Sequence, residues 1–198
     1  MNKDEVEKKT VLRRQLRAAA KECPAEARAL ASAQMCVLLK EQAEWQRARS
    51  ILLFLPLPDE PDLLALVPEA LSAGKIVTFP RYSRSQDSYG AGRITNLSAD
   101  LRHGAFGVNE PAESCPAFAL NRLDFVLVPG LGFSLGGWRL GRGKGYFDRL
   151  LAEVPGFKCG AGFDWQVTVD IPVEPHDIRL DCILTPTRWH RVAGPASV

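Results

Sequence analysis

Two short runs of apolar residues constrain the fold of this chain more than any other feature. Residues 51–54 read Ile-Leu-Leu-Phe, and residues 124–128 read Asp-Phe-Val-Leu-Val. Apolar runs of this length, without alternation, are typical of strands that are buried on both faces of a sheet. Strands of that kind are usually parallel, and parallel strands are joined by helical crossovers. The two runs therefore predict an α/β fold with a central, mostly parallel sheet flanked by helices.

The remaining sequence supplies the helices and further strands that such a fold needs. The spacing of apolar residues predicts helices over residues 4–22, 25–41, 63–73 and 145–153, and strands over residues 75–79, 158–162 and 182–184. Pro68 should kink or shorten the third helix. Glycine and proline punctuate residues 81–123, which predicts an irregular stretch with one short strand near residues 93–96. We expect one domain over residues 1–198, with an N-terminal helical pair (about 4–46) packing on the sheet.

Charge and cysteine content limit the classes of partner. A net charge of +2 is too small to make nucleic acid or an anionic membrane surface the main partner. No apolar run has the length of a membrane span, and the charged N-terminal residues do not resemble a signal peptide. The five cysteines are scattered and odd in number, which favours reduced thiols. We therefore expect a cytoplasmic protein, and a monomer, whose ligands are small molecules.

Residues 128–149 contain the densest set of candidate ligand-binding groups. Seven of the sixteen glycines lie between Gly130 and Gly145, together with Arg139, Arg142 and Lys144. Glycine has no Cβ, so successive backbone N–H groups can converge on one anion, and ligands of open α/β sheets bind where strands end. The segment matches neither the P-loop nor the G-x-G-x-x-G pattern. It is interpreted either as a phosphate-binding loop or as a structural turn with solvated cations.

Other charged residues admit two interpretations each. Asp148, near the start of a predicted helix, either interacts with the helix dipole or binds Mg²⁺ beside a phosphate, with Asp177 or Asp181 as a second carboxylate. Lys9 and Arg13 are one helical turn apart and form either a solvated basic face or part of a site. Glu60 follows a predicted strand in a proline-stiffened loop. It is either part of a site at the end of that strand or an ordinary acid on a surface loop. The three histidines form no nucleophile–base pattern, so covalent catalysis is not indicated.

The sequence resembles a known protein family. The segments Val128-Pro-Gly-Leu-Gly-Phe and Arg139-Leu-Gly-Arg-Gly-Lys-Gly-Tyr-Phe-Asp148 are similar to the signature of the 5-formyltetrahydrofolate cyclo-ligase (5,10-methenyltetrahydrofolate synthetase) family. Shorter matches occur in the same order along nearly the whole chain: Lys9-x-x-Leu12-Arg13, Phe54-Leu55 with Asp59-Glu60, Pro80-Arg81-Tyr82, Gly107-Val-Asn-Glu-Pro111, and His176-Asp177 with Leu180-Asp181. The resemblance implies a single α/β domain that uses ATP and Mg²⁺ to cyclise 5-formyltetrahydrofolate to 5,10-methenyltetrahydrofolate, releasing ADP and phosphate.

The resemblance also implies which residues form the site. It assigns ATP binding to Lys9, Arg13, Arg139, Leu140, Gly141, Arg142, Gly143, Lys144, Gly145, Tyr146 and Phe147. It assigns folate binding to Leu55, Glu60, Phe106, Arg142, Gly143, Lys144, Gly145 and Tyr146, with Glu60 hydrogen-bonding the pterin. Asp148 and Asp177 would hold Mg²⁺, and Arg139, Arg142 and Lys144 would act on the transferred phosphoryl group.

Three positions depart from the family pattern. Ser134 stands where the family commonly has Asp, Phe147 where many members have Tyr, and Phe106 where several have Trp. The alternative function is a catalytically inactive nucleotide- or folate-binding module of the same fold. That module would have lost its acids or Arg139, and this chain retains them. A sugar-phosphate isomerase or acyl-CoA-type enzyme would leave the glycine-rich segment unexplained.

Overall fold

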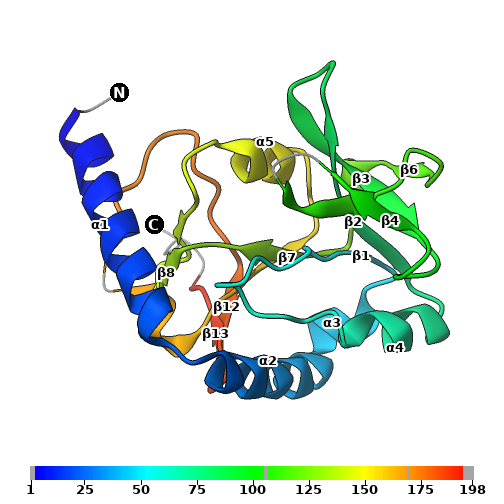
Figure 1. Ribbon diagram of the computed structural model, residues 1–198, viewed down its shortest axis with the longest axis horizontal. Coiled ribbons are helices and arrows are strands. Elements are labelled where there is room, and N and C mark those ends of the chain that lie inside the picture. Colours follow the sequence, from blue (N-terminus) through cyan, green and yellow to red (C-terminus); the bar gives the residue numbers. More distant parts are fainter. Residues whose placement is uncertain (1–2, 105–106, 169, 194–198) are drawn as a thin grey trace.

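The computed structural model describes residues 3–104, 107–168 and 170–193, and its centre is an eight-stranded sheet (Figure 1). The strands of this sheet are β1 (Ser50–Leu52), β2 (Ile76–Ser83), β3 (Ser88–Ile94), β6 (Ala117–Phe118), β7 (Phe125–Pro129), β10 (Phe157–Ala161), β12 (Cys182–Leu184) and β13 (Trp189–Arg191). They are arranged in the order β13-β12-β10-β7-β1-β2-β3-β6. The five strands from β12 to β2 pair in parallel, and the outer pairs are antiparallel. The predicted α/β fold with a mostly parallel sheet is confirmed.

Helices cover both faces of this sheet. Figure 1 shows α2 (Ala25–Lys40), α3 (Ala43–Arg47) and α4 (Leu66–Ser72) below it and α5 (Tyr146–Ala152) above it. Both faces of β7 are covered, so every side chain along it is apolar. Phe125 and Leu127 pack into the core on the α2–α4 side, and Val126 and Val128 pack into the core beside α5. All four side chains are fully buried. Each contributes roughly 1.5–3 kcal/mol of burial free energy, which anchors the strand that leads into the glycine-rich segment.

The two N-terminal helices pack in different places. Helix α2 contributes Met35 and Leu39 to the core under the central sheet. Helix α1 (Lys3–Glu22) instead packs Leu16 against Leu131 and Leu140. These belong to the segment that carries β8 (Gly132–Ser134) and β9 (Arg139–Leu140), which form a three-stranded sheet with β11 (Val167–Thr168). Because α1 is charged around most of its circumference, it offers only a narrow apolar stripe and lies beside the sheet (Figure 1).

The expectation of an irregular stretch over residues 81–123 is wrong. Strand β2 continues through Pro80 to Ser83 and forms an antiparallel hairpin with β3, and β4 (Leu101–His103) pairs with β5 (Asn109–Pro111). A proline is tolerated inside β2 because β1 pairs with β2 only as far as Thr78, so the missing N–H can face an unpaired side. The remaining regular elements are the short 3₁₀ helices η2 (Leu120–Arg122) and η3 (Asp164–Gln166).

Helix α4 is shorter than predicted. It begins at Leu66 rather than Leu63, which places Pro68 in its first turn. There the missing N–H costs nothing, because the first N–H groups of a helix have no intrahelical partner. Among the helices of the described residues, none combines the length and the apolar character that a membrane span requires.

Candidate functional site

A cavity of about 660 Å³ opens at the carboxyl ends of β1 and β7. With one exception, every residue that the resemblance assigned to the site lines it, whereas Asp181, the other candidate for the second carboxylate, does not. The exception, Phe106, lies outside the described residues. Ser134 is not among the lining residues: it is buried in the β8–β9 turn, where its Oγ accepts the Trp138 N–H at 3.3 Å. The departure from Asp at position 134 therefore does not lie on the cavity wall.

Residues 141–145 run along the cavity between β9 and α5. Gly143 has φ of +104° and Gly145 has φ of +65°, values that side-chain-bearing L-residues rarely adopt. The two glycines therefore let the backbone make the turns that carry it along the cavity wall.

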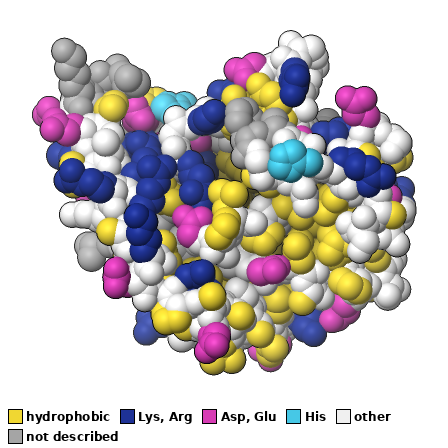
Figure 2. Space-filling model, viewed as in Figure 1, with side chains coloured by type: hydrophobic (Ala, Val, Ile, Leu, Met, Phe, Trp, Pro, Cys, Tyr) yellow, Lys and Arg dark blue, Asp and Glu magenta, His cyan; other side chains and the backbone are white. Residues whose placement is uncertain are grey.

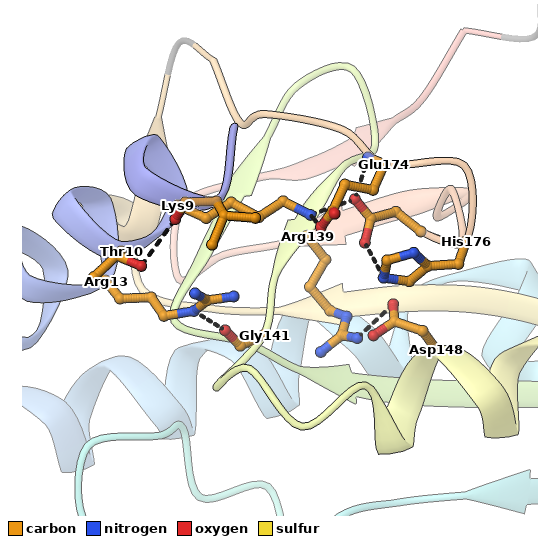
Figure 3. A network of polar contacts seen from close by, with 10 residues as sticks. Lys9, Thr10, Arg13, Arg139, Gly141, Asp148, Glu174 and His176 are labelled. Carbon is orange, nitrogen blue, oxygen red and sulfur yellow. Dashed lines mark hydrogen bonds and ion pairs between the residues drawn. The ribbon is translucent and has the colours of Figure 1, made fainter. Parts of the chain in front are cut away.

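Cations gather on the wall formed by α1 and the glycine-rich segment, as Figure 2 shows beside the hollow. Lys9 is 5% exposed, and its Nζ lies 2.8 Å from Glu174 Oε2 and 2.7 Å from Asp177 Oδ2 (Figure 3). Burial lowers the pKa of Lys9, but hydrogen bonds and attraction to Asp177 and Glu174 outweigh it, so the pKa is raised. One turn further along α1, Arg13 Nε donates to the Gly141 carbonyl at 3.0 Å. The predicted basic face of α1 therefore faces the cavity rather than solvent.

Arg139 is held in a buried pair with Asp148. Its Nη2 lies 2.8 Å from Asp148 Oδ1, its Nη1 donates to the Pro129 carbonyl at 3.3 Å, and its guanidinium lies over the Phe147 ring at 5.8 Å. Its Nε has no hydrogen-bond partner among the described residues. Phe147 thus retains a packing role without the hydroxyl of a tyrosine.

The carboxylates that the resemblance assigns to Mg²⁺ each balance a cation of the protein. Asp148 pairs with Arg139, and Asp177 pairs with Lys9. Asp177 also belongs to a group with Glu174 and His176, whose possible ligand atoms lie within 4.8 Å of one another. The sequence analysis did not assign Glu174 or His176 to the site, and their proximity to Asp177 in the chain was the available signal. Carboxylate oxygens are the donors that Mg²⁺ prefers, so the residues present fit this ion.

A second ion pair joins the loop after β1 to the glycine-rich segment. Glu60 is buried, and its Oε1 accepts Arg142 Nη2 at 3.0 Å and Nε at 3.2 Å, while its Oε2 accepts the Leu57 N–H at 3.0 Å. Arg142 Nη2 also contacts Asp59 Oδ1 at 2.6 Å. Burial raises the pKa of Glu60, although Arg142 opposes the shift. Glu60 is therefore not a surface acid, and the Arg142 guanidinium is held by carboxylates.

The other side of the cavity is largely apolar and was mostly missed in the sequence. Its lining includes Phe54, Leu57, Pro80, Tyr89 and Val108. Glu110 also lines this side and is buried, with Oε2 accepting the Tyr82 N–H at 2.9 Å. Pro80 and Tyr89 come from the β2–β3 hairpin and Glu110 comes from β5, and sequence periodicity predicted neither of these elements in full. The cavity thus has one cationic side and one apolar side, with residues 141–145 between them.

Comparison with known proteins gives a consistent result. The model of the 5-formyltetrahydrofolate cyclo-ligase family matches residues 5–186. The 5-formyltetrahydrofolate cyclo-ligase of Mus musculus is 32% identical over 152 residues, covering 71% of this chain and 75% of the mouse protein. The protein of the same name from Escherichia coli K12 is 30% identical over 149 residues, covering 71% and 80% of the two chains.

Solved structures agree with the sequence matches. The NMR structure of Aquifex aeolicus 5,10-methenyltetrahydrofolate synthetase superposes with a TM-score of 0.85 at 33% identity, covering 96% of this chain and 95% of the other. The synthetase of Mycoplasma pneumoniae shares the fold at 22% identity, with a TM-score of 0.70 over 90% of this chain and 98% of its own.

Proposed function

Because the chain belongs to the 5-formyltetrahydrofolate cyclo-ligase family, we propose that its cavity holds ATP and 5-formyltetrahydrofolate side by side and that residues 141–145 separate them. The enzyme is an ATP-dependent ligase that converts 5-formyltetrahydrofolate to 5,10-methenyltetrahydrofolate. One observation carries the proposed arrangement: a single cavity has a cationic side and an apolar side that meet at the glycine-rich segment.

The cationic side is the binding site for the triphosphate. Lys9, Arg13 and Arg139 present charge there, and backbone N–H groups of residues 140–147 add donors. Lys9 and Arg139 are already oriented by carboxylates, so the phosphates meet cations whose side chains have little freedom left to lose.

The apolar side is the folate site. Leu55 and Tyr146 pack on the flat ring system, and Glu60 accepts hydrogen bonds from the N–H groups of the pterin. The Arg142 guanidinium orients Glu60 and opposes the rise in the pKa of Glu60 that burial causes. The main role of Arg142 is therefore to orient Glu60 in the folate site. It contacts phosphate only where the two substrates meet.

The reaction needs positioning more than protein acids or bases. The formyl oxygen attacks the γ-phosphorus and ADP leaves, which requires in-line approach and neutralisation of charge by Arg139, Arg142 and Lys144. N10 then attacks the activated formyl carbon, and its proton passes to the departing phosphate. The carbon–oxygen bond breaks, phosphate leaves, and the methenyl cation remains. Both attacks join atoms that are already bound in the same cavity.

Asp148 and Asp177 hold Mg²⁺ in this proposal, since both carboxylates lie on the cationic side. When bound, the ion neutralises charge on the phosphate oxygens. Lys9 and Arg139, which contact these carboxylates in the structure, would add positive charge beside the same phosphates. A single domain, a monomeric state and a cytoplasmic location stay predictions from the sequence.

A direct assay tests the proposed function. The protein is mixed with 5-formyltetrahydrofolate and Mg-ATP, and formation of the methenyl chromophore is followed with ADP release. We expect equal amounts of the two products and no chromophore when ATP is omitted. Binding of both ligands without turnover would instead establish the inactive-module alternative.

A further inference from the structure

The tip of the β2–β3 hairpin carries a residue in an unusual backbone conformation. Residues 84–87 form the turn, and Asp87 has φ of +46°, the only non-glycine residue with positive φ in the described part of the chain. Asp adopts this region more readily than most residues, but glycine does so without steric cost. The turn alone would therefore favour glycine at position 87, and the contacts of the Asp87 side chain matter.

The Asp87 carboxylate links the hairpin to α5. Its Oδ1 accepts the Tyr82 hydroxyl at 2.6 Å and the Tyr146 hydroxyl at 3.1 Å. Its backbone carbonyl accepts Arg149 Nη2 at 3.0 Å, and the Arg149 guanidinium lies over the Tyr146 ring at 4.8 Å. Tyr82 belongs to β2, whereas Tyr146 and Arg149 belong to α5, so one residue connects both elements.

These contacts fix three aromatic rings, which we name the tyrosine cluster: Tyr82, Tyr89 and Tyr146. The ring centroids lie 5.4 Å apart for Tyr82–Tyr89, 5.6 Å for Tyr82–Tyr146 and 5.5 Å for Tyr89–Tyr146. Tyr89 and Tyr146 both line the cavity, and Tyr146 directly follows Gly145. Two rings of the cluster therefore lie on the cavity wall, and Tyr82 packs against both of them.

The hairpin tip has little other support from the sheet. Strand β1 pairs with β2 only as far as Thr78, and β6 pairs with β3 only at Ala91 and Gly92. Beyond these residues the hairpin is a two-stranded ribbon that rises beside α5 (Figure 1). A two-stranded ribbon is only marginally stable by itself, so its position depends on contacts with other elements, namely those of Asp87 and the hydrogen bond from the Tyr82 N–H to Glu110 Oε2 at 2.9 Å.

We propose that Asp87 is a positioning residue of the folate site: by holding the hydroxyls of Tyr82 and Tyr146, it fixes the tyrosine cluster as the aromatic wall on which the ring system of the folate packs. This inference rests on the proposed function, because it needs the apolar side of the cavity to bind folate. Asp87 itself does not touch the substrate.

Two substitutions at this position separate positioning from folding. Asp87→Gly removes both hydrogen bonds but suits the positive φ, so the turn is not destabilised. Asp87→Asn keeps an oxygen that can accept both hydroxyls and tolerates the same backbone conformation. Ser85→Ala, in the same turn, is the matched control.

The experiment measures KM for 5-formyltetrahydrofolate and for ATP, folate binding without ATP, and thermal unfolding for each variant. Asp87→Gly should raise the folate KM and the folate Kd about fivefold to tenfold, the loss expected for one or two hydrogen bonds. Its ATP KM should stay within about twofold and its Tm should not fall. Asp87→Asn and Ser85→Ala should stay within about twofold of the unmodified enzyme for both substrates.

Three results would overturn the inference: an unchanged folate KM in Asp87→Gly, an equal loss for both substrates, or an Asn variant as weak as the Gly variant. Failure of the proposed function would be recognised separately. In that case the unmodified protein itself would neither bind 5-formyltetrahydrofolate nor form the methenyl product.

Discussion

Arg142 Nη2 lies 3.0 Å from Glu60 Oε1, so the glycine-rich segment is tied to the loop after β1 by an ion pair whose carboxylate is buried and whose guanidinium is partly exposed. This pair connects the segment that follows β9 with the segment that follows β1, and both line the cavity. A substitution at either residue should therefore affect ligand binding on the apolar side of the cavity more than on the cationic side.

Glu60→Gln is expected to raise the KM for 5-formyltetrahydrofolate more than the KM for ATP. The amide keeps the size of the side chain but loses the charge that pairs with Arg142 and accepts hydrogen bonds from the substrate. Hydrogen bonds to charged groups contribute about 1.5–3 kcal/mol, which corresponds to a rise of roughly tenfold or more. Steady-state kinetics with each substrate varied in turn provide the measurement.

Asp59→Asn is the matched control, because Asp59 contacts the same guanidinium from a more exposed position. It should change the folate KM by less than about threefold, as surface pairs contribute little. A Glu60→Gln variant with parallel losses for both substrates would contradict the separate folate role of Glu60.

Asp148→Asn is expected to weaken the use of Mg-ATP while leaving folate binding largely intact. The substitution removes a proposed oxygen ligand of Mg²⁺ and also leaves Arg139, which is buried, without its carboxylate. Breaking a buried pair costs about 3–5 kcal/mol, so the free energy of unfolding should fall as well. The Mg²⁺ dependence of the rate, the folate Kd and urea unfolding are measured together.

Glu153→Gln, at the exposed end of the same helix, serves as the control and should change none of these quantities. If Asp148→Asn had the Mg²⁺ dependence of the unmodified enzyme at an equal folded fraction, Asp148 would be removed from the proposed metal site.

The sequence carried much of the fold because its apolar runs were unambiguous. Phe125 to Val128 alternate between two cores, a pattern that only a doubly covered strand satisfies, and the site follows from where that strand ends. The hairpin was missed because Pro80 and the glycines of β3 argue locally against strands, whereas pairing between β2 and β3 overrides them. Tyr89 and Glu110 reach the cavity only through that hairpin and β5, so no local pattern identified them.

The ion-pair partners of the charged residues could not be predicted from the sequence either. Lys9 and Glu174 are 165 positions apart, and Arg142 and Glu60 are 82 apart. Ion pairs at such separations depend on how the segments fold together, whereas the spacing of Lys9 and Arg13 on one helical face is local and readable.

In the Lys9→Met variant, the free energy of unfolding should change less with pH in the alkaline range than it does in the unmodified protein. The pKa of Lys9 is raised in the folded state, so its pair with Asp177 and Glu174 stabilises the fold at and below the ordinary Lys range. That contribution is lost as the pH rises through the folded-state pKa, above about 10.5. The pKa of Glu174 is lowered, chiefly by its hydrogen bond to Lys9, so at acid pH the contribution is lost as the pH falls through that lowered value.

Urea unfolding of both proteins between about pH 6 and pH 11 tests this window. The stability difference between the unmodified protein and Lys9→Met should be constant near neutral pH and shrink above about pH 10.5. A difference that grows with alkaline pH would contradict the ion pair.

Gly143→Ala is expected to impair ATP binding through the backbone alone. Gly143 has φ of +104°, and a Cβ built there would meet Arg13 only at 3.5 Å, an ordinary contact distance. The cost is therefore backbone strain of about 1–3 kcal/mol, which the chain relieves by shifting residues 141–145 away from their cavity-lining path.

Gly136→Ala is the control, because that glycine has no positive φ and its nearest neighbour is also at 3.5 Å. Binding of ATP measured by calorimetry should weaken in Gly143→Ala by about tenfold and stay unchanged in Gly136→Ala. Equal ATP affinity in the two variants would mean that the conformation of Gly143 is not required for the phosphate site.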